Sequence, residues 1–409
     1  MRELFKIRLL LAALSLFPSP GASAVEAVKQ VAGATLVPYG FSALDNFQDA
    51  NFLRPWQAFV SGCRSGQIRS QEPLFPGGPV ADLARVCDIA LKRPVNDTAG
   101  ARRFFEVCFE PAGIVLQDAR FADRPAFFTG YYEPVVDGAL ARSESFSEPL
   151  LAAPDDLVAR QPGQPWPAAL DRYSAARRRA DGSLEAYPDR KQIELGGASP
   201  LPRPIAWVRD GIEAFMIQVQ GSAAIRLADG TLLRVSYAGR NGHPYTSIGK
   251  VLVDDGLVPL NEMNLARLKR WVRENGQAAG EAGRALLHRN ASFVFFSADT
   301  SASRAIGPIG GSGLALSELD SIAIDKSIWP YGLPFWIDAD IPWKQPDGES
   351  SPFRRLLIAQ DTGGAIIGPA RADIYFGSGD VAGAIAGGIR HYGRMFVLLP
   401  RPEASGCGA

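Results

Sequence analysis

Two aspartates in one glycine-rich segment restrict the fold of this chain more than any other feature of its sequence. Residues 359–377 read AQDTGGAIIGPARADIYFG, which places Asp361 and Asp373 beside glycines and short β-forming runs. Glycine lets the backbone approach a ligand closely, so carboxylates on such a scaffold suit acid/base chemistry. Asp361 alone could serve a turn. Asp373 lies inside the run ADIYF, and a buried strand does not tolerate an unpaired charge. The segment therefore predicts a carboxylate site on a β scaffold.

The composition excludes several function classes. The 409-residue chain has 43 basic and 43 acidic side chains, so no net charge favours nucleic acid or an anionic membrane surface. Its three histidines, His243, His288 and His391, lie far apart, and its four cysteines match no zinc motif. We therefore expect no metal site and no catalytic triad that depends on histidine.

The first 24 residues are typical of a cleavable export signal. Arg2, Lys6 and Arg8 precede a short apolar run, and Ala-Ser-Ala at residues 22–24 fits a small-residue cleavage site. The apolar run is too short to span a bilayer, and no cysteine follows the cleavage site to carry a lipid. We therefore expect a periplasmic or otherwise extracytoplasmic protein that neither spans the membrane nor carries a lipid anchor.

In an oxidising compartment the cysteines can form disulfides. Cys63, Cys87, Cys108 and Cys407 allow three complete pairings, and the sequence does not choose among them. A bridge between Cys87 and Cys108 is compatible with the sequence.

Hydrophobic periodicity predicts a β-rich chain with a few helices. In the first part of the chain, the expected elements are helices at residues 82–92 and 99–110 and strands at residues 214–220, 225–227 and 232–237. A turn at Ala228-Asp229-Gly230 joins the last two strands into a hairpin. Residues 149–203 are rich in proline and arginine and are expected to form long loops.

The later part of the chain continues this pattern. Asn261 is expected to cap a helix whose apolar face carries Leu265, Leu268 and Val272, and a second helix should end near His288. The expected strands after it are residues 292–297, 320–324, 334–337, 356–360, 372–376 and 395–399, with a glycine-weakened helix at residues 378–389.

Several motifs in a fixed order resemble one known family. The runs SIAIDK at residues 321–326, IAQDTGGAI at 358–366 and ADIYFG at 372–377 resemble the three-aspartate domain of murein-active proteins. Upstream, the chain has FTGYYEP at residues 128–134, IQVQGS at 217–222 and YAGRNGHPY at 237–245. Together these motifs resemble the membrane-bound lytic murein transglycosylase A family, from roughly residue 40 to residue 400.

The resemblance implies a mainly β fold with two lobes. The main domain is expected to be a double-psi β-barrel built from residues 25–134 and 246–405, with a few peripheral helices. A smaller β domain is expected as an insertion at residues 135–245. A groove between the two domains would suit an extended polymer such as a peptidoglycan glycan strand.

The resemblance also implies the reaction. A lytic transglycosylase cuts the MurNAc–GlcNAc bond and closes the sugar's own C6 hydroxyl onto C1, leaving a 1,6-anhydro end without metal or organic cofactor. One carboxyl can supply the proton and take it back, and the resemblance assigns this role to Asp373. Asp361 is expected to support it, because a neighbouring carboxylate raises the pKa of an acid. Asp325 is either a third member of this cluster or a turn residue.

The other family-like motifs supply the expected substrate surface. Aromatic faces stack on sugar rings, and amides and carboxylates bind hydroxyl and acetamido groups. The expected substrate-binding residues are Tyr131, Tyr132, Glu133, Gln218, Gln220, Gly221, Ser222 and Asn241. If residues 214–220 form a strand, Gln218 and Gln220 share one face. The glycines at residues 307–313 lack the Lys-Ser/Thr of a phosphate loop and are expected to form a turn at a barrel end.

Two alternatives remain at this point. A non-catalytic murein-binding module could hold a glycan on the same aspartates without cutting it. An aspartic protease is the weaker alternative, because Asp361-Thr362-Gly363 is one signature turn and a single-chain protease needs two. Substitution of Asp373 separates the first alternative from an enzyme.

Overall fold

A computed structural model describes residues 29–71, 80–117, 126–161, 163–197, 202–299, 307–346, 348–401 and 407. The predicted export signal lies outside these residues and stays a prediction. Within the described part of the chain, none of the helices has the length and hydrophobicity needed to cross a membrane.

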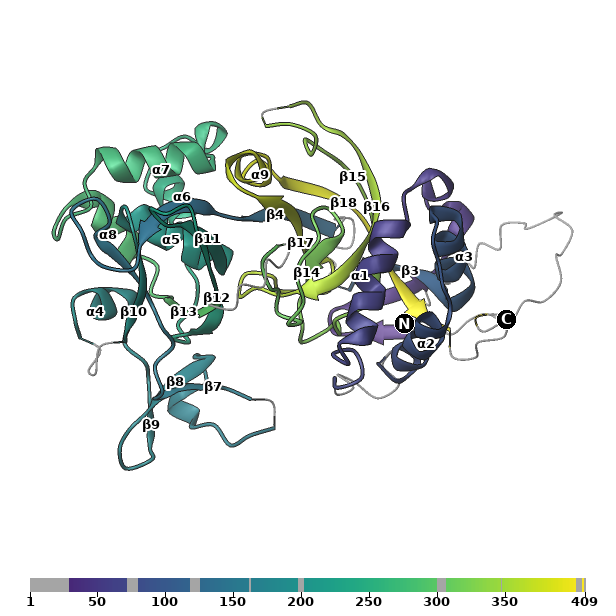
Figure 1. Cartoon of the computed structure of the whole chain (residues 1–409), viewed down its shortest axis with the longest axis horizontal. Coiled ribbons are helices and arrows are strands. Elements are labelled where there is room, and N and C mark those ends of the chain that lie inside the picture. Colours follow the sequence, from purple (N-terminus) through teal and green to yellow (C-terminus); the bar gives the residue numbers. More distant parts are fainter. Residues whose placement is uncertain are drawn as a thin grey trace, which may run out of the picture.

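Six strands close into a barrel at the centre of the molecule (Figure 1). They are β4 (Ala126–Glu133), β14 (Ser321–Ala323), β15 (Pro334–Ile341), β16 (Ser351–Asp361), β17 (Arg371–Ser378) and β18 (Arg390–Pro400). The order is β18-β15-β16-β14-β17-β4, and β4 pairs back onto β18. On the other part of β18 the sheet continues into β3 (Phe109–Leu116), β2 (Ala34–Pro38) and β1 (Lys29–Val31). The mainly β prediction is confirmed, whereas the double-psi connection stays a prediction.

Three helices pack beside the barrel: α1 (Leu53–Arg64), α2 (Val80–Lys92) and α3 (Thr98–Cys108). The two helices predicted here correspond to α2 and α3, and Asp97 caps α3 by accepting from the Gly100 N–H at 2.6 Å. The first helix, α1, was not predicted. Its buried aromatic residues join those of α3 and the barrel strands in one continuous core.

Two disulfides tie this end of the chain together. Cys63 pairs with Cys87, which joins α1 to α2, and Cys108 pairs with Cys407, which joins α3 to the C-terminal segment. The bridge between Cys87 and Cys108 that the sequence allowed is therefore wrong, because each of those cysteines has another partner.

A second lobe is built on a six-stranded sheet of order β13-β12-β11-β5-β10-β6. Its strands are β5 (Val135–Ala139), β6 (Glu148–Leu151), β10 (Pro204–Val208), β11 (Ser222–Arg226), β12 (Leu232–Arg240) and β13 (Val294–Asp299). The predicted hairpin is confirmed as β11 and β12. This sheet includes β13, which lies well beyond the boundary expected at residue 245.

Helices cover this sheet, and one of them corrects a prediction. The helices are α5 (Gly211–Gln220), α6 (Ile248–Asp254), α7 (Leu265–Glu274) and α8 (Ala282–His288). The strand predicted at residues 214–220 is wrong, because these residues form α5. Asp210 caps the helix through the Glu213 N–H, and Gly221 ends it with a φ of 78°. Both sides of α5 are buried, so its apolar residues show no one-sided period.

Two smaller differences concern caps and loops. The helix after residue 260 is capped by Asn264 rather than by Asn261, which precedes it outside α7. The region predicted as long loops contains β7 (Leu157–Ala159), β8 (Ala175–Arg178), β9 (Leu184–Glu185) and α4 (Arg190–Glu194). Strands β7 to β9 form a small sheet that projects from the second lobe (Figure 1).

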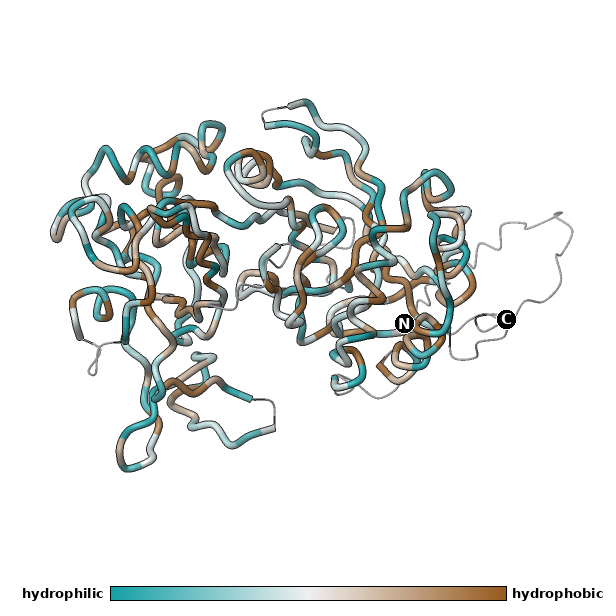
Figure 2. The backbone as a smooth tube through the Cα atoms, viewed as in Figure 1, coloured by the Kyte–Doolittle hydropathy of each residue, from teal (hydrophilic) through white to brown (hydrophobic). Residues whose placement is uncertain are grey.

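The two lobes meet where β4 leaves the barrel. Helix α9 (Asp380–Ala386) packs on β4 and β17, and a Cβ on Gly383 would lie 2.6 Å from the Tyr132 ring. From the other lobe, Leu265 of α7 contacts Gly387. Figure 2 shows hydrophobic segments concentrated inside both lobes and hydrophilic ones in the outer loops.

We predict that Gly130→Ala destabilises the protein by about 1–3 kcal/mol, because the new methyl group over-packs a tight contact. A Cβ at Gly130 would lie 2.8 Å from the Ala386 Cα and 2.9 Å from the Phe376 ring. Chemical denaturation measures the loss. The matched control is Gly388→Ala, whose Cβ would have ordinary contacts at 3.4 Å and beyond. Equal stabilities of the two variants would contradict the close packing of α9 on β4.

Candidate active site

The two aspartates of the glycine-rich segment lie on strands that flank the same residue. In the pairing of β14 with β17, Asp373 is opposite Ala323, and in the pairing of β14 with β16, Asp361 is opposite Ala323. Adjacent strands are about 4.8 Å apart, so the Cα atoms of the two aspartates are roughly 10 Å apart. Ala323 between them is buried in a small cluster with Tyr131 and Tyr375.

Both carboxyls are on the outer face of the barrel. Ala372, Ile374 and Phe376 belong to the barrel core. Side chains alternate along a strand, so Asp373 and Tyr375 point to the opposite face. Both aspartates are half-buried, which means that protein surrounds them without closing off solvent.

Asp361 is held at the end of β16 by backbone donors. Its Oδ1 accepts from the N–H groups of Gly311 and Thr362, both at 2.8 Å. Burial raises the pKa of Asp361 to about 6, and the charge of Asp373 acts in the same direction, against the lowering effect of the N–H donors. This carboxyl therefore changes its charge close to neutral pH.

Asp373 is held by its neighbour on β4. The Thr129 hydroxyl donates to Asp373 Oδ1 at 2.6 Å, and these two residues are also register partners in the parallel pairing of β4 with β17. Burial raises the pKa of Asp373, whereas the charge of Arg371 and the Thr129 hydrogen bond lower it. Two coupled carboxyls that face one site retain a shared proton to higher pH than an isolated carboxyl does.

The glycine-rich loop at residues 307–313 explains how backbone N–H groups reach Asp361. A Cβ at Gly310 would lie 2.6 Å from the Gln360 carbonyl oxygen, and one at Gly311 would lie 2.5 Å from the Tyr331 hydroxyl. Only glycine allows this approach. The predicted turn at a barrel end is confirmed, since Ser312 N–H donates to Gln360 O at 3.0 Å.

Tyr131 lies beside the pair on the same outer face. It is the register partner of Tyr375, and the two rings are 5.3 Å apart in a small cluster with Leu316, Ala323 and Ile366. Burial and the neighbouring Asp361 raise the pKa of Tyr131 well above its ordinary value. Its hydroxyl is buried close to Asp361 but does not reach hydrogen-bonding geometry with any described residue.

Asp325 is a turn residue. Its Oδ1 accepts from the Ser327 N–H and hydroxyl, and its Oδ2 accepts from the Gly368 N–H at 2.8 Å. Of the two roles left open by the sequence, the described contacts support the turn.

Glu133 is buried at the junction of the lobes and has its carboxylate occupied. It is 1% exposed, with Oε1 accepting from Arg234 Nε at 3.2 Å and Oε2 accepting from the Ser378 hydroxyl at 2.7 Å. Arg234 belongs to β12 of the second lobe, and Ser378 belongs to β17 of the barrel. Glu133 therefore joins the lobes, and its predicted contact with substrate is not supported.

The two glutamines do not share a face, which corrects the prediction from residues 214–220. Gln218 is buried on α5, and its Oε1 accepts from Arg190 NH2 at 2.6 Å. Gln220, at the end of the same helix, accepts from the Tyr132 N–H at 3.0 Å. Gln218 supports a buried arginine inside the second lobe, whereas Gln220 lies at the junction with β4.

The remaining predicted substrate residues fall into two groups. Asn241 is fully buried, and its amide bonds the carbonyls of Pro188 and Ala291 and the Phe293 N–H, each at 2.9 Å. Asn241 therefore stabilises the second lobe, and Tyr132, which packs under α9, likewise has a structural role. Gly221 and Ser222 follow Gln220 at the start of β11, with Gly221 half-buried and Ser222 8% exposed.

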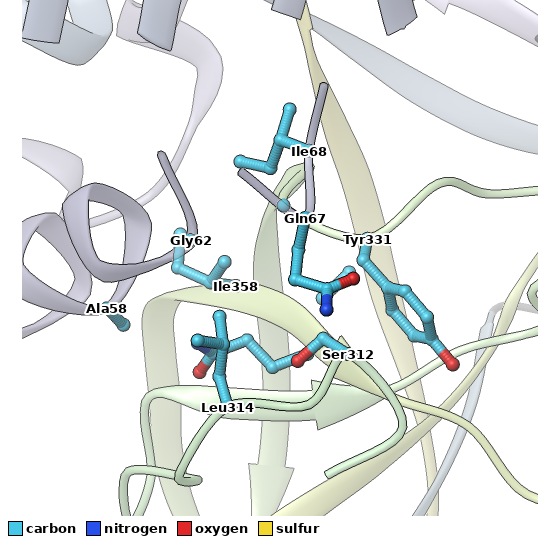
Figure 3. A pocket seen from close by; sticks show the side chains of 11 residues that line it. Ala58, Gly62, Gln67, Ile68, Ser312, Leu314, Tyr331 and Ile358 are labelled. Atoms are coloured by element: carbon cyan, nitrogen blue, oxygen red, sulfur yellow. The ribbon is translucent and has the colours of Figure 1, made fainter. Parts of the chain in front are cut away.

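The pocket in Figure 3 lies between residues 58–68 and residues 358–360 of β16. It has a volume of about 210 Å³, part of it open to solvent, and Ser312, Tyr331 and Gln67 line it. Neither Asp361 nor Asp373 lines it. No cluster of metal-ligating side chains occurs among the described residues.

Sequence reasoning missed two residues next to Asp373. Thr129 bonds Asp373, and Arg371 donates to the Thr129 hydroxyl oxygen at 2.7 Å. Thr129 was part of the FTGYYEP motif, and Arg371 precedes Asp373 by two positions. Only the parallel pairing of β4 with β17 brings them together.

Comparison with known proteins agrees with this architecture. Residues 127–297 match the family described as MltA specific insert domain, and residues 320–399 match the 3D domain. A two-lobed protein with an MltA insert and a three-aspartate barrel is the class that fold and sequence define. The chain belongs to the membrane-bound lytic murein transglycosylase A (MltA) family.

Three relatives illustrate the likeness. Membrane-bound lytic murein transglycosylase A of Vibrio cholerae is 36% identical over 275 residues, which cover 66% of this chain and 64% of that protein. The chain thus spans slightly less than two thirds of that curated relative. The crystal structure of a membrane-bound lytic murein transglycosylase from Agrobacterium tumefaciens is similar, with a TM-score of 0.77, 29% identity and coverage of 90% and 98% of the two chains. E. coli MltA with bound chitohexaose has a TM-score of 0.60, 28% identity and coverage of 94% and 100%.

We predict that Asp361→Asn stabilises the protein near neutral pH. The carboxyl has a pKa of about 6 in the fold, above its unfolded value of about 3.9, so wild-type stability falls as pH rises between these values. The amide keeps an acceptor for Gly311 and Thr362 and cannot ionise, so the variant should gain about 2 kcal/mol above pH 6.

Denaturant unfolding at pH 7.5 and at pH 3.5 tests this. The gain should be present at the higher pH and absent at the lower one. Asp340→Asn is the control, because Asp340 is 66% exposed. A variant less stable than wild type at pH 7.5 would contradict the assigned burial of Asp361.

We predict that Gln218→Ala lowers the free energy of unfolding by about 1.5–3 kcal/mol, because it removes a hydrogen bond to the charged and buried Arg190. The affinity of the folded variant for chitohexaose should stay at the wild-type value. Val219→Ala is the matched control, because Val219 is exposed in the last turn of α5. A loss of affinity without a loss of stability would instead support the original prediction that Gln218 binds substrate.

Proposed function

We propose that the protein is a lytic transglycosylase of peptidoglycan, which cleaves the β-1,4 bond between MurNAc and GlcNAc and leaves 1,6-anhydro-MurNAc ends. The observation that carries this proposal is the pair of carboxyls Asp361 and Asp373 on either side of Ala323, both with raised pKa. Family membership supports the same reaction, since the relatives are named lytic murein transglycosylases.

In this mechanism Asp373 acts twice. As an acid it gives its proton to the glycosidic oxygen while the bond from that oxygen to C1 breaks and C1 becomes oxocarbenium-like. As a base the resulting carboxylate takes the proton of the C6 hydroxyl while the C6 oxygen bonds to C1. The carboxyl is protonated again at the end, so no water is consumed and each turnover restores the starting state.

Asp361 supports this cycle through its charge. When Asp361 is ionised, it favours the protonated form of Asp373, because the coupling between two carboxyls is reciprocal. Its negative charge also favours a positively charged sugar carbon in the transition state. The backbone N–H groups of Gly311 and Thr362 hold it in place without neutralising it.

The substrate surface that we propose is smaller than the one expected from the motifs. Tyr131 lies beside the two carboxyls, and Gln220, Gly221 and Ser222 mark the edge of the second lobe near β4. Chitohexaose bound to the E. coli relative supports an oligosaccharide ligand for this family. Glycan strands of peptidoglycan are accordingly the proposed partner.

Location follows from the proposed substrate. Peptidoglycan lies outside the cytoplasmic membrane, so we infer an exported, extracytoplasmic protein, which agrees with the signal predicted at residues 1–24. Relatives are named membrane-bound. Absence of a lipid anchor remains our prediction from the sequence around the cleavage site.

We predict that Asp373→Asn lowers the release of 1,6-anhydro products from purified sacculi by about 10²–10⁴-fold, because the amide cannot transfer the proton. The fold and the affinity for chitohexaose should be preserved. Mass spectrometry of the soluble products measures turnover, and Asp340→Asn serves as the control at an exposed aspartate.

The outcomes separate the alternatives. Wild-type products with ordinary reducing ends would identify a hydrolase. Binding without soluble products from the wild-type protein would identify a murein-binding module. Full activity of Asp373→Asn would show that Asp373 is not the acid. A protease would instead release peptides and leave the glycan strands intact.

A further inference from the structure

We propose that Arg371 and Thr129 act as a positioning pair that reserves one oxygen of Asp373, Oδ2, for proton transfer. This inference rests on the proposed function, because it concerns the carboxyl assigned as the acid. Neither residue needs to touch the substrate for this role.

The first part of the pair is a guanidinium with a fixed place. Arg371 is on β17, on the same face as Asp373, and its guanidinium carbon lies 5.2 Å above the Phe127 ring. It donates to the Ala372 carbonyl and, through NH2, to Thr129 Oγ1 at 2.7 Å. Stacking and two hydrogen bonds leave this side chain little freedom to move.

The second part is a hydroxyl whose direction this guanidinium determines. Arginine has only donors, so Thr129 Oγ1 must accept from Arg371. The hydroxyl proton is then directed elsewhere, and Asp373 Oδ1, at 2.6 Å, is its acceptor among the described residues. Oδ1 therefore remains an acceptor in both charge states of Asp373, and the transferable proton resides on Oδ2.

This assignment fits both halves of the reaction. The proton leaves Oδ2 for the glycosidic oxygen, and the proton of the C6 hydroxyl returns to Oδ2. Throughout, the Thr129 hydroxyl keeps its bond to Oδ1, so the carboxyl need not rotate between the two steps. A positioned proton is one source of the rate gain in general acid catalysis.

Charged and titratable groups around Asp373 come from each packed strand. Arg371 is on its own strand, Tyr131 is on β4, Asp361 is on β16, and Arg390 of β18 is the register partner of Thr129. Of these, Arg371 lowers the pKa of Asp373 against the effect of burial. Removal of Arg371 should therefore keep Asp373 protonated to higher pH. The alkaline limb of the pH–rate profile should then shift to higher pH.

The first experiment tests the hydroxyl. Thr129→Val removes it at nearly constant shape, and Thr129→Ser keeps it. We expect kcat on sacculi to fall about tenfold or more in the valine variant and to stay close to wild type in the serine variant, with chitohexaose affinity unchanged in both. Equal losses in both variants would mean that Thr129 only packs, and would overturn the proposal.

The second experiment tests the cation without requiring turnover. Carbon-13 NMR of labelled aspartate carboxyls, with the Asp373 signal assigned by its absence in Asp373→Asn, gives the titration of this group. Arg371→Met should raise the midpoint by about one pH unit. The matched control is Arg390→Met, since Arg390 is exposed on the neighbouring strand and should leave the midpoint unchanged.

The two readouts distinguish the two proposals. If the wild-type protein released no glycan fragments but Arg371→Met shifted the Asp373 midpoint as expected, the proposed function would fail, and with it the catalytic role of the pair, while the effect of Arg371 on Asp373 would stand. If turnover were normal but neither Thr129→Val nor Arg371→Met changed the rate or the midpoint, the pair would be refuted.

Discussion

The parallel pairing of β4 with β17 is the interaction on which the rest of the site depends. It brings together residues 244 positions apart, so that Thr129 lies beside Asp373 and Tyr131 beside Tyr375. Because β4 also pairs with β18, the same strand closes the barrel. Closing the barrel and building the site are therefore one structural event. A strand without this partner would leave Asp373 exposed to solvent and without its hydrogen bond.

The same strand also carries the connection to the second lobe. After Tyr131 its regular pairing with β17 is interrupted until Glu133, and the Tyr132 N–H donates to Gln220 instead. One residue later, Glu133 is buried between Arg234 of the second lobe and Ser378 of the barrel. Buried polar groups that are fully bonded fix geometry strongly, because a broken bond leaves an unsatisfied charge. The FTGYYEP segment thus places Thr129 and Tyr131 beside the two aspartates and the following Tyr132 and Glu133 at the lobe junction.

Much of the barrel could be predicted from the sequence. Its strands are short apolar runs bounded by glycine and proline, and β15, β16, β17 and β18 each contain the predicted segment. The secondary-structure prediction failed for α5, because burial on two sides of this helix hides the helical period of its apolar residues. Residues 214–220 have apolar side chains at nearly every position, so a helix covered on both sides resembled a strand. The helix α1 is a different case, because its exposed residues Arg54, Gln57, Ser61 and Arg64 recur at helical spacing and the sequence analysis missed this period.

The sequence by itself determined the family, the mainly β class and the two aspartates, because ordered motifs and local periodicity are properties of neighbouring residues. Only the tertiary structure decided which polar residues face the site. Glu133, Gln218 and Asn241 have side chains that could bind sugar hydroxyl groups. Each is instead buried and hydrogen-bonded to other protein groups. Thr129 resembles an ordinary strand residue, yet strand pairing places it against Asp373, where Arg371 of the same strand as Asp373 donates to it. The disulfide partners were decided in the same way, since Cys108 and Cys407 meet across 299 positions. Such contacts depend on how segments that are distant in the sequence pack together, and the local sequence pattern does not specify that packing.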